Sequence, residues 1–126
     1  MLLIFGGLLG AVAVAMGAFI EHGLRGHISA EHWGLMMTGL RYHLVHAGVI
    51  VAIGVACTRG LDCGRLVLWS GGLLTLGIGL FSGSLYLTVL ADQPGLVDVT
   101  PIGGTLLIIG WLGLALGGVM RLKPTP

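Results

Sequence analysis

The stretch LLIFGGLLGAVAVAMGAFI, residues Leu2–Ile20, decides the fold class, because it is long, apolar and free of charged side chains. An α-helix needs about 20 mostly apolar residues to cross the hydrocarbon core of a bilayer. No Lys or Arg precedes this run, although a secretory signal would begin with positive charge. We therefore expect the segment to remain in the protein as a membrane-spanning helix.

The rest of the chain repeats this pattern. Further apolar segments cover residues 42–58, 66–91 and 101–120, and short clusters of charged residues separate them. Of the 126 residues, 56% are hydrophobic and only 9% are charged, whereas soluble domains are about 25% charged. A soluble monomer could not keep so much apolar surface in water. We predict one all-α domain, residues 1–126, that forms a glycine-rich four-helix bundle in a membrane.

The polar stretch between the first two predicted spans contains a short amphipathic segment. Apolar side chains recur at helical spacing at Trp33, Met36, Met37 and Leu40. Ser29 precedes the segment and is a suitable N-cap. Residues 30–40 therefore form either an interfacial helix that lies on the membrane or the outer extension of the second span.

The basic residues predict how the chain is oriented. Lys and Arg are enriched in cytoplasmic loops, and four spans place both termini on one side. That side carries Arg59, Arg65, Arg121 and Lys123, whereas the other side carries Arg25 and Arg41. We expect both termini in the cytoplasm. A net charge of +1 without a basic block gives no field that would gather nucleic acid.

The glycines recur at intervals of three, four and seven residues. Small residues let transmembrane helices approach closely, and this close packing drives helix association where lipid is as apolar as the side chains. We therefore predict that one stripe on each of three helices is a packing face. The predicted packing residues are Gly6, Gly10 and Gly17 in the first helix, Gly72, Gly79 and Gly83 in the third, and Gly103, Gly110, Gly113 and Gly117 in the fourth.

All five histidines fall within residues 22–46, on the predicted outer side. His43 and His46 are three residues apart and share a helical face. Imidazole is a common ligand of transition metals, and a Glu side chain can complete a site. His22, His43, His46 and Glu21 are therefore candidate metal ligands. Hydrogen bonding at the interface, haem ligation and a pH-sensing role are the alternatives.

The predicted topology brings polar side chains of all four helices to the outer half of the bundle. This outer polar cluster comprises His22, His46, Ser82, Ser84, Tyr86 and Thr100. It is either a set of hydrogen bonds between helices or a pocket for a ligand or a lipid headgroup. Trp111 falls near the middle of the fourth span, where its indole N–H needs an acceptor inside the bundle unless it faces a partner helix.

Several motifs, in order along the chain, resemble the domain-of-unknown-function 423 family of small bacterial inner-membrane proteins. They are GAF at 17–19, HGL at 22–24, Tyr42 with His46, FSGSLYL at 81–87, TPIGG at 100–104 and GW at 110–111. The resemblance covers nearly the whole chain and implies four spans with no established activity.

The resemblance also separates the polar residues into two groups. All six members of the outer polar cluster match the family pattern, whereas His27, His32 and His43 do not belong to it. The family pattern GAFGAHGL reads GAFIEHGL here, so that Ile20 and Glu21 stand where the family has small residues.

Cys57 and Cys63 fall on the predicted cytoplasmic side, where thiols stay reduced. Two cysteines without a neighbouring histidine do not form a zinc site. We therefore expect two structural thiols.

Neither a catalytic triad order nor a nucleotide-binding fingerprint occurs in the sequence. A transporter of this size would be expected to carry an ionisable coupling residue within a span, but Glu21 lies at the end of the first one. We expect a protein without enzymatic activity, an accessory or structural subunit that packs against lipid and against other membrane proteins or itself. The alternative is a protein that binds metal, haem or lipid at the outer polar cluster. The sequence identifies no cofactor.

Overall fold

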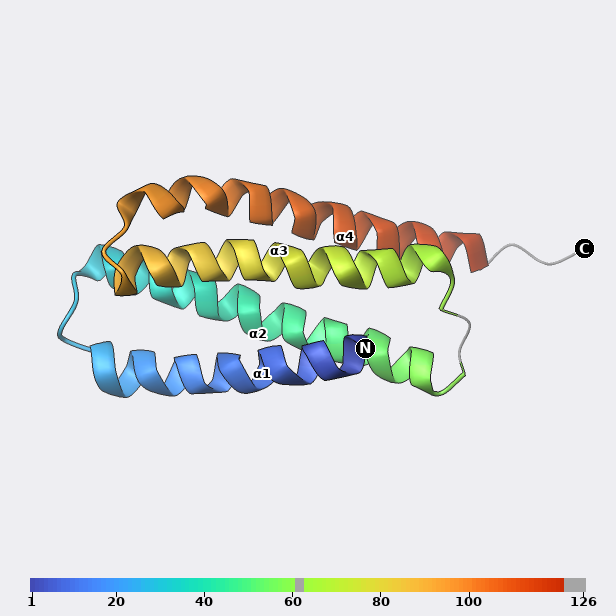
Figure 1. Ribbon diagram of the computed structural model, residues 1–126, viewed down its shortest axis with the longest axis horizontal. Helices are drawn as coiled ribbons and strands as arrows, with labels where there is room; N and C mark the ends of the chain where they lie inside the picture. Colours follow the sequence, from blue (N-terminus) through green and yellow to red (C-terminus); the bar gives the residue numbers. More distant parts are fainter. Residues whose placement is uncertain (61–62, 122–126) are drawn as a thin grey trace, which may run out of the picture.

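The computed structural model describes residues 1–60 and 63–121, and these residues form four long helices (Figure 1). They are α1 (Leu2–Phe19), α2 (Ala30–Thr58), α3 (Arg65–Leu90) and α4 (Thr100–Arg121). Each is long and apolar enough to cross a membrane, and the described residues contain no strand. The predicted all-α membrane bundle is therefore confirmed, and the predicted spans agree with α1, α3 and α4 to within one residue.

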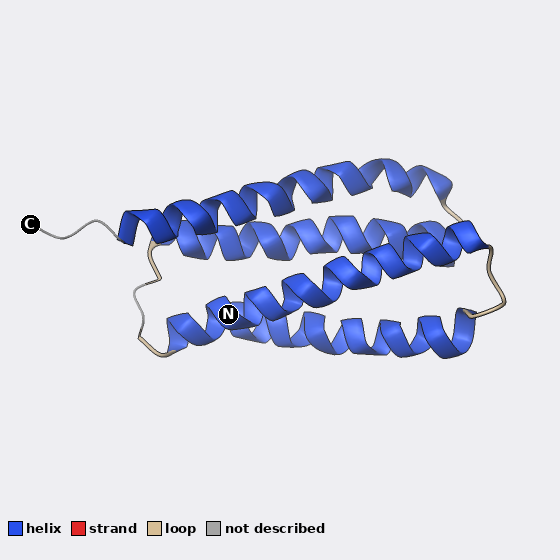
Figure 2. Cartoon of the chain, turned by 180° about the vertical axis from the view of Figure 1, so that it is seen from behind, coloured by secondary structure: helices blue, strands red, loops and turns tan. Residues whose placement is uncertain are grey.

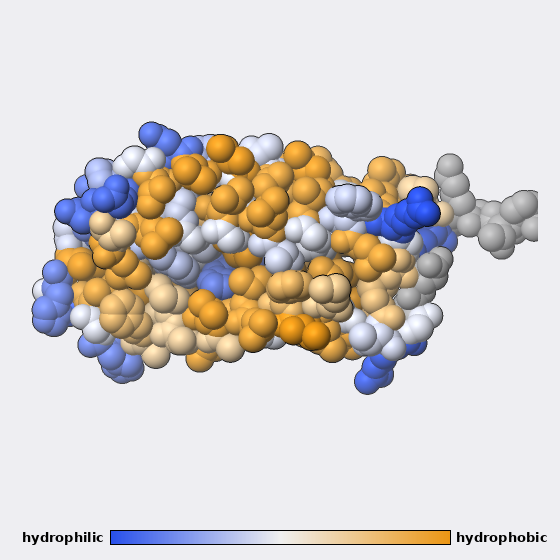
Figure 3. All heavy atoms as spheres, in the orientation of Figure 1, coloured by the Kyte–Doolittle hydropathy of each residue, from blue (hydrophilic) through white to orange (hydrophobic). Residues whose placement is uncertain are grey.

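The helices lie side by side in chain order, and each runs antiparallel to the one before it (Figures 1 and 2). Within the described ranges, α1 and α4 have no pair of Cα atoms within 8 Å of each other. The central pair, α2 and α3, is consequently the more buried, and α1 and α4 expose most of their side chains. Figure 3 shows the result on one face: apolar side chains cover the middle, and hydrophilic ones gather at the two ends.

Residues 30–40 are the outer extension of α2 and not a separate interfacial helix. The Ser29 side chain caps the helix by accepting a hydrogen bond of 3.1 Å from the His32 backbone N–H. From there α2 continues without a break for 29 residues, which is roughly 43 Å at 1.5 Å per residue, against a hydrocarbon core of about 30 Å. Met36 is fully buried and Leu40 is buried, because the outer turns of α2 pack against the neighbouring helices.

A π-helical turn, Ile20–Leu24, follows α1. Ile20, which replaces a small residue of the family pattern, is fully buried in a cluster with Met36, Leu40 and Tyr86. Glu21 forms a surface ion pair with Arg25, four residues on. Both departures from the pattern therefore have a structural role: Ile20 fills the outer core, and Glu21 pairs at the end of the helix.

The predicted glycine stripe of α4 is a packing face. A Cβ atom on any of its four glycines would come within 3.0 Å of α3 atoms. Gly103 lies against the backbone of α3: a Cβ on Gly103 would lie 2.8 Å from the Phe81 Cα and 2.9 Å from the Gly77 carbonyl oxygen. In α1, Gly6 packs against Val51 and Gly17 touches Leu40, whereas Gly10 faces open space.

The predicted stripe of α3 does not pack against the other helices of the bundle. Among the described residues, no atom of another element lies within 4 Å of a Cβ built on Gly72, Gly79 or Gly83. The glycines of α3 that pack closely are Gly71 and Gly77. Since α3 carries small residues on two faces, spacing alone could not tell which of the faces is covered. The prediction also missed two packing glycines of α2, Gly39 and Gly54.

Cys57 and Cys63 form a disulfide bond, with their Cα atoms 5.4 Å apart. The expectation of two free thiols is wrong for this structure, because the short connection from α2 to α3 turns the chain back and brings the two side chains together. Arg59, Arg65 and Arg121 lie at the same end of the bundle as the disulfide, and Lys123 lies outside the described residues.

We expect Gly54→Ala to destabilise the protein. A Cβ at this position would lie 2.5 Å from the backbone nitrogen and 2.6 Å from the Cα of Leu3, and backbone atoms cannot move aside as a side chain can. Overpacking of this kind costs about 1–3 kcal/mol. The free energy of unfolding in detergent measures the effect. Gly48→Ala is the matched control, because Gly48 lies in the same helix and faces open space; equal stability of the two variants would contradict the prediction.

Candidate functional site

The outer halves of α2 and α3 meet at Gly39. A Cβ at Gly39 would lie 2.9 Å from the Tyr86 ring, so only a glycine permits this approach. The Ser82 hydroxyl donates a hydrogen bond of 2.7 Å to the Gly39 carbonyl oxygen. Ser82 is 1% exposed, and the hydrogen bond therefore joins two helices inside the bundle, where no water competes.

One turn further along α2, His43 pairs with Tyr86. The His43 Nδ1 atom lies 3.3 Å from the Tyr86 hydroxyl, and both side chains are buried. The ring also lies beside the backbone of Leu9 in α1, but its Nε2 atom has no hydrogen-bond partner of normal geometry among the described residues. His43 thus has one satisfied nitrogen and one unsatisfied nitrogen in the interior.

His46 connects α2 to α4 through both ring nitrogens. Its Nδ1 atom lies 2.7 Å from the Tyr42 carbonyl oxygen, and its Nε2 atom lies 3.1 Å from Nε1 of Trp111. A carbonyl can only accept and an indole N–H can only donate. Nδ1 of His46 therefore donates a hydrogen bond to the Tyr42 carbonyl oxygen, and Nε2 accepts the hydrogen bond from Trp111.

The sequence does not show whether the Trp111 indole N–H has an acceptor inside the bundle, and the structure identifies His46 as that acceptor. The indole N–H finds its acceptor inside the bundle, while 45% of the side chain is exposed on the outer surface of α4. The Tyr42 ring packs at a tilt against Phe81 of α3, with centroids 4.4 Å apart. The His46 ring is thus held by α2 and α4, and the neighbouring Tyr42 ring contacts α3.

The start of α4 is attached to α3 by hydroxyl groups. Ser84 Oγ and Thr100 Oγ1 lie 2.7 Å apart, and Ser84 also donates a hydrogen bond of 2.9 Å to the Phe81 carbonyl oxygen. In this arrangement Thr100 donates to Ser84. The TPIGG motif therefore begins with a hydroxyl that holds α4 in place, followed by the Gly103 contact with α3.

The six residues of the outer polar cluster do not line one common pocket. His46, Ser82 and Tyr86 each contact a different residue of a neighbouring helix, and Ser84 and Thr100 contact each other. His22 is exposed in the π-helical turn, away from the α2–α3 contact. The arrangement agrees with the interpretation of the cluster as hydrogen bonds between helices.

The four candidate metal ligands are not brought together either. Within residues 1–60 and 63–121, no group of three His, Cys, Asp or Glu side chains could hold a metal ion. Both His46 nitrogens are occupied, and His43 is held by Tyr86 through one of its two. Glu21 and His22 lie on the turn after α1, with Glu21 paired to Arg25.

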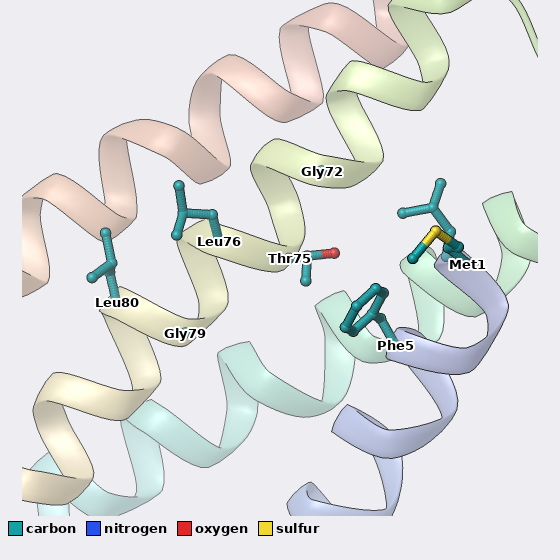
Figure 4. A pocket seen from close by; sticks show the side chains of 8 residues that line it. Met1, Phe5, Gly72, Thr75, Leu76, Gly79 and Leu80 are labelled. Carbon is teal, nitrogen blue, oxygen red and sulfur yellow. The ribbon is translucent and has the colours of Figure 1, made fainter.

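An apolar groove lies between α1 and the exposed glycine face of α3 (Figure 4). It has a volume of about 420 Å³, and its floor includes Gly72, Gly79 and Thr75 of α3. Met1 and Phe5 of α1 stand on one side, and Leu76 and Leu80 of α3 stand on the other. Gly72 and Gly79 of the predicted stripe thus lie on an open face of α3 that the described residues do not cover.

Comparison with known proteins agrees with this architecture. The family model described as "Protein of unknown function (DUF423)" matches residues 16–104, more than half of the chain. The chain belongs to this family. The DUF423 match includes the His46 position, the FSGSLYL motif and the TPIGG motif, which make the contacts between α2, α3 and α4.

Curated membrane proteins from several bacteria are similar over most of their length. The UPF0382 membrane protein of Haemophilus influenzae is 40% identical over 110 residues, which are 87% of this chain and 86% of the relative. The UPF0382 inner membrane protein YgdD of Escherichia coli K12 is 39% identical over 122 residues, 97% of this chain and 91% of that protein. No solved structure shows a significant match.

The packing residues that the sequence analysis missed were detectable in principle. Gly39, Ala47 and Gly54 recur along α2 at intervals of eight and seven residues, and all three are buried. The acceptor of Trp111 had no such signal, because His46 and Trp111 are 65 residues apart in the chain.

We expect a measurable coupling between His46 and Trp111. The variants Trp111→Phe, His46→Leu and the combination of both form a double-mutant cycle. Hydrogen bonds between transmembrane helices average about 0.6 kcal/mol, with measured values up to about 1.7, and the coupling energy should fall in this range. Unfolding in detergent provides the four stabilities. Trp69→Phe serves as the control, because Trp69 is 71% exposed; additive effects of His46→Leu and Trp111→Phe would exclude the hydrogen bond.

Proposed function

We propose that this DUF423 protein is a non-enzymatic accessory subunit of the bacterial inner membrane, which packs against a transmembrane helix of a larger complex. The observation that carries the proposal is the open glycine face of α3. A Cβ on Gly72, Gly79 or Gly83 would meet no atom within 4 Å among residues 1–60 and 63–121, yet small residues in a membrane helix are suited to close contact with another helix. The groove beside them is apolar and therefore fits a transmembrane helix.

The polar side chains support the same proposal. A catalytic or ligand site needs polar groups that point into a shared cavity. Here Ser82, Ser84 and His46 form hydrogen bonds to neighbouring helices, and the groove is lined almost entirely by apolar atoms. This distribution suits a protein that holds helices together better than one that transforms a substrate.

Gly79→Leu tests this role at the centre of the groove. We expect the variant to fold but to lose its partner, because a leucine would fill the space into which a partner helix packs. Native membranes are solubilised in mild detergent, and native gels with mass spectrometry report the size and composition of the particle. The wild type should migrate in a large complex of fixed stoichiometry, and Gly79→Leu should be released from it.

Gly48→Leu is the matched control, since Gly48 is also an exposed helical glycine with open space around it. It should remain in the complex. A wild-type protein that migrates alone or as a small homo-oligomer would refute the accessory role, and equal behaviour of the two variants would refute the groove as its contact.

We further propose that both termini face the cytoplasm. Four basic residues of the sequence fall on the same side of the spans as the termini, namely Arg59, Arg65, Arg121 and Lys123, and basic residues are enriched on the cytoplasmic side of a membrane. The Cys57–Cys63 pair lies at the same end. Disulfides persist in the bacterial periplasm but are rare in the cytosol. Under this orientation, the disulfide that the structure contains would be reduced in the cell.

The oxidation state of this pair in the cell tests the orientation. Cells are quenched in acid and denatured, and a maleimide carrying a polymer tag is added without reductant. Two added tags per chain are expected for thiols that face the cytosol, and Cys57→Ser should accept one. Tags that appear only after reduction would mean that the disulfide exists in the cell and that this end, with both termini, faces the periplasm.

A further inference from the structure

A second cavity lies at the end of the bundle where α3 begins and α4 ends. It has a volume of about 400 Å³ and is bounded by Arg65 at the start of α3 and Arg121 at the end of α4. Leu66, Val67 and Met120 provide apolar walls. The cavity is separate from the groove between α1 and α3 and shares no residue with it.

Positive charge is concentrated at the mouth of this cavity. The guanidinium of Arg121 reaches across to the N-cap of α3, where a Cβ on Gly64 would lie 3.9 Å from one of its Nη atoms. Arg65 is the first residue of the same helix. A helix N-terminus itself carries a partial positive charge. Two cations are therefore held beside a positive helix end, an arrangement in which like charges repel.

Among residues 1–60 and 63–121, neither Arg65 nor Arg121 has an ion-pair partner; Asp62, three residues before Arg65 in the sequence, lies outside these ranges. The ion pair between Arg25 and Glu21 is the one found in those ranges, and it lies at the opposite end of the bundle. The α3 N-terminus also receives no side-chain cap from these residues. An anion in the cavity would be attracted by both guanidinium groups and by the helix N-terminus.

The position of the cavity along the membrane normal indicates which class of anion could bind there. The 26 residues of α3 span roughly 39 Å at 1.5 Å per residue, close to the thickness of a bilayer with its headgroups, about 40–45 Å. The two arginines therefore lie at headgroup level, and the walls of Leu66, Val67 and Met120 continue toward the hydrocarbon. Figure 3 shows hydrophilic side chains next to apolar ones at this end of the molecule.

We infer that this cavity binds the phosphate group of an anionic membrane lipid. Guanidinium groups bind phosphate oxygens through paired, charge-assisted hydrogen bonds, and basic pockets beside transmembrane helices bind lipid headgroups. Arg65 and Arg121 hold the phosphate, and the apolar walls contact the start of an acyl chain. The site is independent of the proposed accessory role and does not depend on which side of the membrane this end faces.

Native mass spectrometry of the full-length protein tests the site. The protein is exchanged into detergent with equal amounts of phosphatidylglycerol and phosphatidylcholine, and the bound lipids are counted. The wild type should retain phosphatidylglycerol in preference to phosphatidylcholine. Removing both arginines, Arg65→Gln with Arg121→Gln, should weaken phosphatidylglycerol binding about tenfold for each arginine, the effect of losing one charge-assisted contact.

Arg59→Gln is the matched control, because Arg59 is exposed at the same end but does not line the cavity. The double lysine variant, Arg65→Lys with Arg121→Lys, keeps the charge but loses the paired geometry, and it should bind with intermediate strength. If the glutamine variant did not fold, the lysine variant would still decide the matter. Equal retention of the two lipids, or equal losses in the control and the glutamine variant, would overturn the site.

A competition experiment distinguishes a bound lipid from a bound soluble anion. Inorganic phosphate at millimolar concentration should leave phosphatidylglycerol bound, because it cannot replace the contact with the apolar walls. Complete displacement by inorganic phosphate would overturn the lipid assignment and make free phosphate the ligand.

Discussion

The fold depends on glycine contacts that bring helix backbones closer together than side chains would allow. Gly103 lies against the Phe81 backbone, Gly54 lies against the Leu3 backbone, and Gly39 lies against the Tyr86 ring. In a membrane the helices gain little from burying apolar surface, because lipid is equally apolar, so association relies on close packing. Each of these glycines therefore fixes one of the three interfaces, α3–α4, α1–α2 and α2–α3.

The polar contacts follow from this close approach. The Ser82 hydroxyl reaches the Gly39 carbonyl oxygen because no side chain separates α2 from α3 there. His46 uses one nitrogen for its own helix and the other for Trp111 of α4. The TPIGG motif thus combines Gly103, which admits the neighbouring helix, with Thr100, which holds it. His43 lies outside the family pattern and has a nitrogen with no described partner.

Much of the fold could be predicted from the sequence, because hydrophobic length and glycine spacing are local properties. The spans and the α4 packing face followed from them. The choice between the two small-residue faces of α3 could not, since it depends on where α1 and α4 lie. The pairing of Cys57 with Cys63 and of His46 with Trp111 depends on how the chain turns back. The candidate site was predicted in its members but not in its arrangement, because residue types do not specify which nitrogen meets which donor.

Close packing at glycines also explains why the two glycine faces of α3 differ. Gly77 and Gly71 bind α3 to its neighbours, so that Gly72 and Gly79, one or two positions further around the helix, are turned outward. Since α1 and α4 do not meet within the described ranges, no other helix covers that face. The structure therefore uses one set of α3 glycines for its own stability and leaves the second set beside an apolar groove. Small residues on a membrane helix permit close contact with another helix, and this face therefore leaves room for the partner that the proposed accessory role requires.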